Sequence, residues 1–191
     1  MKEDPMMANN HKFYEMTVKE KKVHQFKKLN HIWHKYPDKR RDFFCGRMKP
    51  DRCYWYYPGQ GQAANVLHLT MFYQSMMTFC TKEQLKTWEP LLDNYDIHGC
   101  YAQTEIGHGS DVSSLKTTAI FDQSTDEFVL HTPSIDATKW WPGELGGTAN
   151  FALVMAKCLI PDGQGNMDDY GIQPFILQIR DRDTHKHMPG I

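Results

Sequence analysis

Two short segments carry residue types and turns that could do chemistry. The first is 100–111 (CYAQTEIGHGSD), and the second is 139–143 (KWWPG), so that Thr104 and Gly143 stand 39 positions apart with strand-like sequence between them. A strand that ends in a polar turn can present fixed backbone N–H groups and a hydroxyl, which stabilise developing negative charge without reorganising. The glycines of such a turn let the backbone approach a flat ring without a Cβ clash.

Helical periodicity dominates the sequence before these segments. Apolar side chains recur at helical spacing over residues 11–35 and 63–79, and a third helix is predicted to begin after Thr81, which opens a capping-box pattern. The proline after Tyr36 is expected to end the first helix, because a residue before proline is pushed out of helical conformation. Pro90 is expected to bend or end the third helix.

The period changes to that of strands near residue 97. Alternating or continuously apolar runs bounded by turns predict a strand at 97–105, a hairpin at 115–132, a buried strand at 151–160 and a last strand at 175–179. Residues 37–62 are interpreted as irregular. We therefore expect an α+β chain, with an N-terminal helical domain at residues 1–96 and a β domain at residues 97–191.

Composition limits the class of protein. With 40% hydrophobic and 13% aromatic residues, a chain of 191 residues can bury a core. Charge is uneven, because residues 1–52 carry 14 Lys and Arg against 7 Asp and Glu, whereas residues 53–191 carry 8 against 16. The basic half could meet an anionic partner such as a ligand phosphate, a lipid surface or an acidic subunit, although a solvated helical face is the favoured interpretation.

Cysteines, apolar runs and histidines argue against several other classes. The five cysteines are scattered, odd in number and lack a Cys-x-x-Cys pair, so free thiols in a reducing compartment are expected. No apolar run approaches the ~20 residues of a membrane span, and the acidic start does not resemble a secretory signal. His31 with His34 and His185 with His187 lack further ligands at metal spacing, so no metal is predicted. No nucleic-acid-binding module is recognisable.

The two segments together, in this order and at this spacing, resemble the flavin-facing wall of the peroxisomal acyl-CoA oxidases, which are relatives of the acyl-CoA dehydrogenases. The flanking residues 126–129 (DEFV) and 170–171 (YG) extend the resemblance, which runs from about residue 66 to 191. Such enzymes have an N-terminal helical domain, a central β-barrel domain and a long C-terminal helical bundle. The resemblance implies that this chain supplies the first domain and an incomplete barrel, with the bundle absent.

The resemblance also assigns ligands to individual residues. It implies that FAD is the cofactor and a fatty acyl-CoA the substrate, with cofactor-binding roles for Gln103, Thr104, Trp140, Trp141 and Gly143 and a place beside the acyl-CoA for Ser110. Thr104 would hydrogen-bond the flavin, and the two tryptophans would pack around its ring. On composition alone, a Thr-Glu turn and a Trp pair are also ordinary parts of a β-barrel core.

Three positions depart from the family's pattern. Glu144 stands where glycine is usual, Gly147 where lysine is frequent, and Cys80 where glycine is frequent. A carboxylate at position 144 would disfavour charge build-up on a nearby reduced flavin or on CoA phosphates. The loss of a lysine at 147 removes a phosphate partner.

The implied reaction is oxidation of a fatty acyl-CoA to the trans-2-enoyl-CoA, with electrons passed from FAD to O₂ to give H₂O₂. The family's catalytic glutamate lies in the C-terminal half, so no catalytic residue is assigned here and the chain alone is expected to be inactive. Three alternatives remain open: a fragment of an ordinary oxidase, one half of a split oxidase completed by a partner chain, or a non-catalytic structural subunit of a larger complex. The expected compartment is the peroxisome, with the mitochondrion as the alternative.

Overall fold

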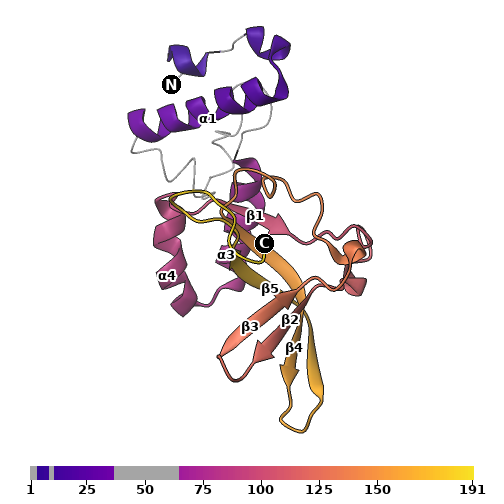
Figure 1. Ribbon diagram of the computed structural model, residues 1–191. Helices are drawn as coiled ribbons and strands as arrows, with labels where there is room; N and C mark the ends of the chain where they lie inside the picture. The colour runs from indigo at the N-terminus through magenta and orange to yellow at the C-terminus, as the bar shows by residue number, and fades with distance from the viewer. Residues whose placement is uncertain (1–3, 9–10, 37–64) are drawn as a thin grey trace.

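The computed structural model describes residues 4–8, 11–36 and 65–191 (Figure 1). Two short 3-10 helices, Pro5–Met7 and His11–Glu15, precede helix α1, Val18–Lys35. After the gap, a π-helical turn at His68–Phe72 continues directly into α3, Tyr73–Phe79, and α4 follows at Lys82–Asp93. The irregular segment expected at 37–62 lies outside the described residues.

Reciprocal capping by threonine fixes where two helices begin. Thr17 Oγ1 accepts the Glu20 N–H at 3.3 Å, while the Glu20 carboxylate accepts the Thr17 N–H at 2.8 Å. Thr81 forms the same capping box with its third helical residue, as predicted. The predicted helical start at residue 11 was therefore wrong, because residues 11–15 form a separate 3-10 turn and α1 begins only after its cap.

Two prolines were expected to limit helices, and they act differently. Helix α1 ends at Lys35, ahead of Pro37, as predicted. Pro90 does not end α4, which runs on to Asp93. Proline lacks an N–H and crowds the preceding turn, but its own carbonyl still accepts, and the Asn94 N–H donates to it at 3.0 Å, so the last turn of α4 forms after Pro90.

Five strands form one open, curled mixed sheet that is organised around β4, Phe151–Pro161. β1 (Gly99–Ala102) and β2 (Thr118–Asp122) both pair with β4 in parallel, at residues 151–154 and 157–159 respectively. β3 (Glu127–His131) pairs antiparallel with β2, and β5 (Met167–Gln178) pairs antiparallel along nearly all of β4. β1 and β2 therefore share one edge of β4 in succession, and β5 occupies the other.

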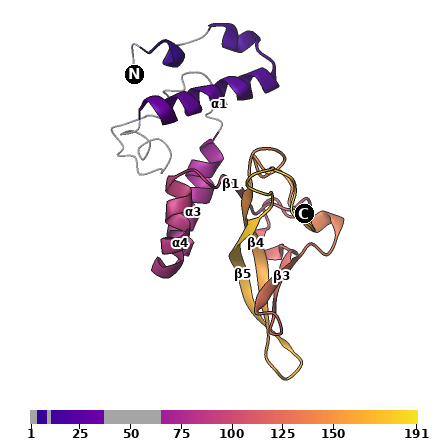
Figure 2. The same cartoon turned by 60° about the vertical axis from the view of Figure 1, so that its left-hand side comes forward.

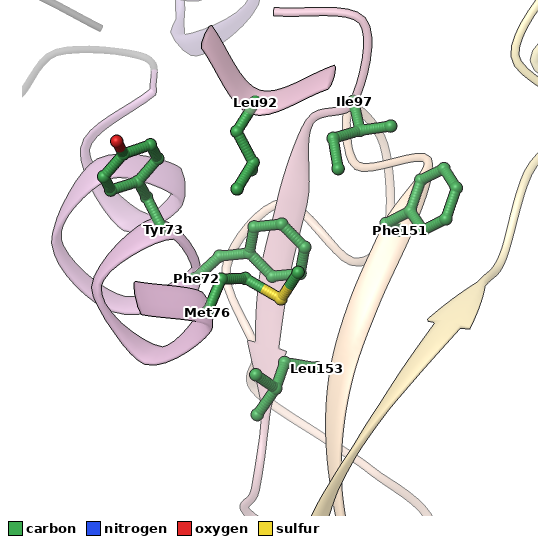
Figure 3. Close-up of a cluster of buried hydrophobic side chains, with 7 residues drawn as sticks. All are labelled: Phe72, Tyr73, Met76, Leu92, Ile97, Phe151 and Leu153. Atoms are coloured by element: carbon green, nitrogen blue, oxygen red, sulfur yellow. The ribbon is translucent and has the colours of Figure 1, made fainter. Parts of the chain in front are cut away.

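The main core lies between the helices and the sheet. Figure 2 shows α3 and α4 on one side of the sheet, and Figure 3 shows the side chains that fill the space between them. The cluster consists of Phe72, Tyr73, Met76, Leu92, Ile97, Phe151 and Leu153. The Phe72 ring packs so close to β1 that a Cβ on Gly99 would lie 2.3 Å from it, so this position requires glycine.

A second cluster of smaller side chains covers the opposite face of β4. It contains Cys100, Ala102, Ala149, Ala152, Val154 and Ile179. Because successive strand residues point to opposite faces, the first half of β4 is buried on both sides, which explains its continuously apolar sequence. Helices followed by an open β sheet are the α+β architecture expected from the sequence. No helix in the described ranges is long and apolar enough to cross a membrane.

Candidate functional site

The two segments singled out by the sequence lie side by side at the end of β1. Glu105 and Lys139 form an isolated antiparallel bridge. The Trp140 N–H donates to the Thr104 carbonyl at 3.1 Å, and the Ile106 N–H donates to the Thr138 carbonyl at 3.0 Å. The structure therefore brings Thr104 and Trp140 into direct backbone contact, although strands β2 and β3 separate them in sequence.

Thr104 offers donors that the described part of the chain does not use. The residue is half-buried, and its carbonyl is held by Trp140. Neither its N–H nor its hydroxyl has a hydrogen-bond partner among residues 4–8, 11–36 and 65–191. Two donors without a partner in the described residues, at a half-buried position, are available to an acceptor-rich ligand.

The two tryptophans face outward and do not fill the core. Trp140 is 66% exposed and Trp141 is 86% exposed. The alternative that this pair forms part of a β-barrel core therefore does not hold for the described residues. Trp141 also has a φ of +77°, which turns the chain sharply between the two indoles. Two exposed indoles, the first of which belongs to a residue whose N–H is bonded to Thr104, suit a flat aromatic ligand.

Gly143 is required by packing within the chain itself. A Cβ at this position would lie 2.0 Å from Cδ1 of Leu67, so a side chain would collide with the helical part. Gly143 borders a cleft of about 830 Å³, together with apolar side chains of Phe13, Phe26 and Val66 and the lysines Lys21 and Lys22. The glycine thus has a reason for its type that is independent of any bound ring.

Ser110 stands apart from the other predicted site residues. It lies in an exposed loop, where its carbonyl accepts the Val112 N–H at 3.1 Å. Within the described ranges no hydrogen bond joins it to Gln103, Thr104, Trp140, Trp141 or Gly143. Gln103 and Thr104, by contrast, are fixed directly against the second segment.

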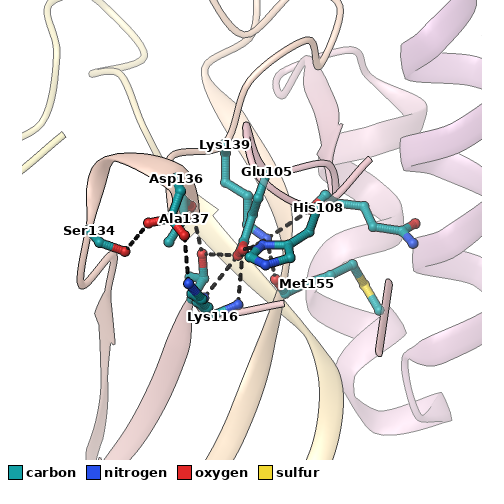
Figure 4. Close-up of polar contacts among 10 residues, drawn as sticks. Glu105, His108, Lys116, Ser134, Asp136, Ala137, Lys139 and Met155 are labelled. Carbon is teal, nitrogen blue, oxygen red and sulfur yellow. Dashed lines mark hydrogen bonds and ion pairs between the residues drawn. The ribbon is translucent and has the colours of Figure 1, made fainter. Parts of the chain in front are cut away.

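Glu105, the residue after Thr104, forms the centre of a buried polar cluster (Figure 4). Its side chain is fully buried, and its two carboxylate oxygens accept five hydrogen bonds at 2.6–3.1 Å. The donors are the Lys116 N–H, the Thr117 N–H and hydroxyl, His108 Nδ1 and Lys139 Nζ. Burial alone would raise the pKa of Glu105, but these hydrogen bonds outweigh it and hold that pKa at about 2.

The sequence did not reveal this cluster. Glu105 and Lys139 each appeared only as members of a motif, and no pairing between them was inferred. The available signal was their charge, since an acid and a base stand on the two segments that the resemblance brings together. Charged side chains are almost never fully buried unless they are paired.

A second set of contacts holds the loop that follows Gly143. The Glu144 carboxylate accepts hydrogen bonds from the His98 ring and from the Thr148 hydroxyl, the latter at 2.7 Å. The Arg180 guanidinium donates to the Leu145 and Ala149 carbonyls at 2.8 and 2.5 Å. Glu144 was expected to place a negative charge near the flavin or CoA, but its side chain is only 10% exposed and both these partners lie within the chain.

The histidines do not gather into a metal centre. His31 contacts the Asp4 carboxylate at 2.8 Å, and His185 contacts the Gly147 carbonyl at 2.7 Å. In the part of the chain that the structure describes, no group of three or more His, Cys, Asp or Glu side chains could hold a metal ion.

Helices followed by a curled sheet, with two hydrogen-bonded segments at its edge, define the acyl-CoA dehydrogenase and oxidase type of fold. The acyl-CoA oxidase from tomato matches with a TM-score of 0.80 and 35% identity, over 98% of this chain and 27% of the tomato chain. Acyl-CoA oxidase-1 from Caenorhabditis elegans, complexed with FAD and ATP, matches with a TM-score of 0.80 and 33% identity, over 98% of this chain and 28% of its own.

Sequence comparison leads to the same family. The family model described as acyl-coenzyme A oxidase N-terminal matches residues 1–98. Peroxisomal acyl-coenzyme A oxidase 1 from Arabidopsis thaliana is 50% identical over 125 residues, which is 65% of this chain and 18% of the relative. The chain belongs to the acyl-CoA oxidase family. It spans between 18% and 28% of the length of these relatives.

Proposed function

We propose that this chain supplies the helical domain, residues 1–96, and the central β domain, residues 97–191, of an FAD-dependent acyl-CoA oxidase. The whole oxidase would remove two hydrogens from a fatty acyl-CoA to give the trans-2-enoyl-CoA, and O₂ would take them up as H₂O₂. One observation carries the proposal: within the described residues the Thr104 N–H and hydroxyl have no partner, and its carbonyl accepts the N–H of Trp140, whose side chain is exposed like that of Trp141.

The residues of the site fit a flavin. The Thr104 N–H and hydroxyl would donate to the flavin's polar edge, with Gln103 beside them, and the two indoles would cover its ring and exclude water. Gly143 would contact the ring through its backbone, and Ser110 would lie towards the acyl-CoA. When bound, FAD supplies the acceptor for the β-hydride of the acyl thioester and the route for electrons to O₂.

The chain is not expected to catalyse this reaction alone. Removal of the α-proton needs a carboxylate that is free to act as a base. Glu105, Asp111 and Glu144, the carboxylates on or next to the two motif segments, already accept hydrogen bonds from within the chain. We therefore assign the base to a segment or partner outside these residues. The relative named as peroxisomal supports the peroxisome as the compartment.

The test is made on the native complex that contains this chain. Its intact mass, its flavin absorbance near ~450 nm and its H₂O₂ production from a fatty acyl-CoA are measured together. We expect the complex to contain flavin and to produce H₂O₂ from a fatty acyl-CoA. The 22.3 kDa chain alone is expected to produce no H₂O₂. A complex that contains an intact C-terminal partner but holds no flavin and gives no turnover would overturn the proposal and leave a structural subunit.

A further inference from the structure

Lys139 lies beneath the proposed flavin-facing segment and uses all its hydrogen-bonding capacity there. Its Nζ donates to the Gln103 carbonyl at 2.9 Å, to Glu105 Oε1 at 3.1 Å and to the Met155 carbonyl at 2.8 Å. An ammonium group has three N–H donors, so each has one acceptor. The side chain is only 11% exposed. Lys139 is therefore a fixed cation that joins the end of β1 to the middle of β4 (Figure 4).

The carbonyl that Lys139 holds belongs to the same peptide unit as the Thr104 N–H. Because the peptide is planar, fixing the Gln103 oxygen also fixes the direction of that N–H. A cation at the oxygen polarises the peptide and makes its N–H a stronger donor. On the other side of Thr104, the Trp140 N–H holds the next carbonyl at 3.1 Å. Both peptide planes around Thr104 are thus fixed by the second segment.

Glu105 keeps the cation in place. Its carboxylate lies against Lys139 and has four further donors from His108, Lys116 and Thr117. The donors from Lys116 and Thr117 anchor Glu105 to the chain just before β2. The position of Lys139 is therefore determined by β2 and β4 together, not by its own loop alone.

We propose that Lys139 is a positioning residue of the flavin site, which orients and polarises the Gln103–Thr104 peptide so that the N–H of Thr104 donates to the flavin. This inference rests on the proposed function, because it assumes that the ligand above Thr104 is a flavin. Lys139 itself lies on the opposite side of that peptide and does not touch the ligand.

The first test compares Lys139→Met with Lys157→Met in the native complex. Lys157 is a matched control, since it is a lysine of the same sheet whose ion pair with Asp169, at 3.8 Å, is exposed and does not reach residues 103–105. We expect Lys139→Met to weaken FAD binding about tenfold, because the Thr104 N–H loses its fixed direction and its polarisation, and to make the flavin's midpoint potential more negative. Lys157→Met is expected to retain wild-type FAD affinity and potential.

The second test needs no flavin. Amide hydrogen exchange of Trp140 is measured in the full chain, where its N–H is protected by the Thr104 carbonyl. Lys139→Met is expected to lose this protection, and Lys157→Met to keep it. If Lys139→Met does not fold, Lys139→Met with Glu105→Gln removes both buried charges and is used in its place.

The outcomes distinguish the positioning role of Lys139 from the proposed flavin-dependent function. Wild-type FAD affinity together with wild-type Trp140 protection in Lys139→Met overturns the positioning role. Lost Trp140 protection without any change in FAD affinity or potential also overturns it, because Lys139 would then act only on the fold. A wild-type complex without flavin overturns the proposed function and, with it, the flavin part of this inference, while the exchange measurement still decides whether Lys139 fixes the segment.

Discussion

The His98 ring donates a hydrogen bond to the carboxylate of Glu144, the residue directly after Gly143. His98 immediately precedes β1, so this pair draws the loop after Gly143 against the start of the strand that leads to Thr104. Both side chains are only 10% exposed. Glu144 also has a φ of +73°, a conformation that glycine adopts freely and other residues adopt at a cost.

Two substitutions of Glu144 separate the carboxylate from the backbone strain. Glu144→Ala removes the partner of His98 but keeps a Cβ at positive φ, whereas Glu144→Gly removes the partner and relieves the strain. We expect Glu144→Ala to lower the free energy of unfolding by about 1–3 kcal/mol, because His98 loses its partner. Glu144→Gly should lower it by about 1 kcal/mol less, because it also relieves the strain. Urea denaturation at pH 7 measures both, and equal values for Ala and Gly would contradict a strained backbone at this position.

Glu105 should give the fold a specific pH dependence. Its pKa is about 2 in the folded chain against 4.5 for the free side chain, so its contribution is fully present above about pH 4.5 and is lost as pH falls through about 2. The shift corresponds to roughly 3 kcal/mol. The difference in unfolding free energy between wild type and Glu105→Gln should therefore be constant from pH 7 to about pH 5 and shrink below it.

The control for this titration is Glu83→Gln. Glu83 is an exposed carboxylate on α4 whose partner, Lys86, is also exposed. Its substitution should change the unfolding free energy by less than about 0.5 kcal/mol at any pH, because exposed ion pairs contribute little. A difference between wild type and Glu105→Gln that stays the same down to pH 2 would show that Glu105 is not held ionised by its donors.

The sequence predicted the type and order of the elements better than their ends. The hairpin of β2 and β3 and the buried strand β4 were confirmed, because turn residues bound them and their apolar pattern is strong. The start of β5 was wrong by eight residues, since residues 167–171 are exposed and show no alternation. The predicted start of α1 was wrong because the apolar pattern begins at Phe13, four residues before the N-cap Thr17.

The sequence predicted which residues belong to the site but not the contacts between them. The resemblance joined residues 100–111 to residues 139–143, and the structure brings Thr104 against Trp140. The buried pairing of Glu105 with Lys139 depends on the register between the two segments, which no local pattern fixes. The collision that a side chain at Gly143 would have with Leu67 depends on how the helical part packs, so the sequence could not show it.

Gly99 should tolerate no side chain, because the Phe72 ring lies 2.3 Å from where a Cβ would be. Gly99→Ala is expected to lower the unfolding free energy by about 1–3 kcal/mol through overpacking. Phe72→Leu in the same chain should restore part of this loss by making room. Gly146→Ala is the matched control, since a Cβ there meets nothing within 4 Å. Thermal and urea unfolding measure all three, and equal stability of Gly99→Ala and Gly146→Ala would contradict the tight contact.

Trp141 should matter for the ligand and not for the fold. Its side chain is 86% exposed, so Trp141→Ala is expected to change the unfolding free energy by less than about 0.5 kcal/mol. If its indole covers the flavin, the same substitution should weaken FAD binding by roughly tenfold in the native complex, the scale of a lost aromatic contact. Val129→Ala, which truncates a 54% exposed side chain on β3, should change neither quantity. A large loss of stability in Trp141→Ala would place the indole in the core, and unchanged FAD affinity would remove it from the flavin site.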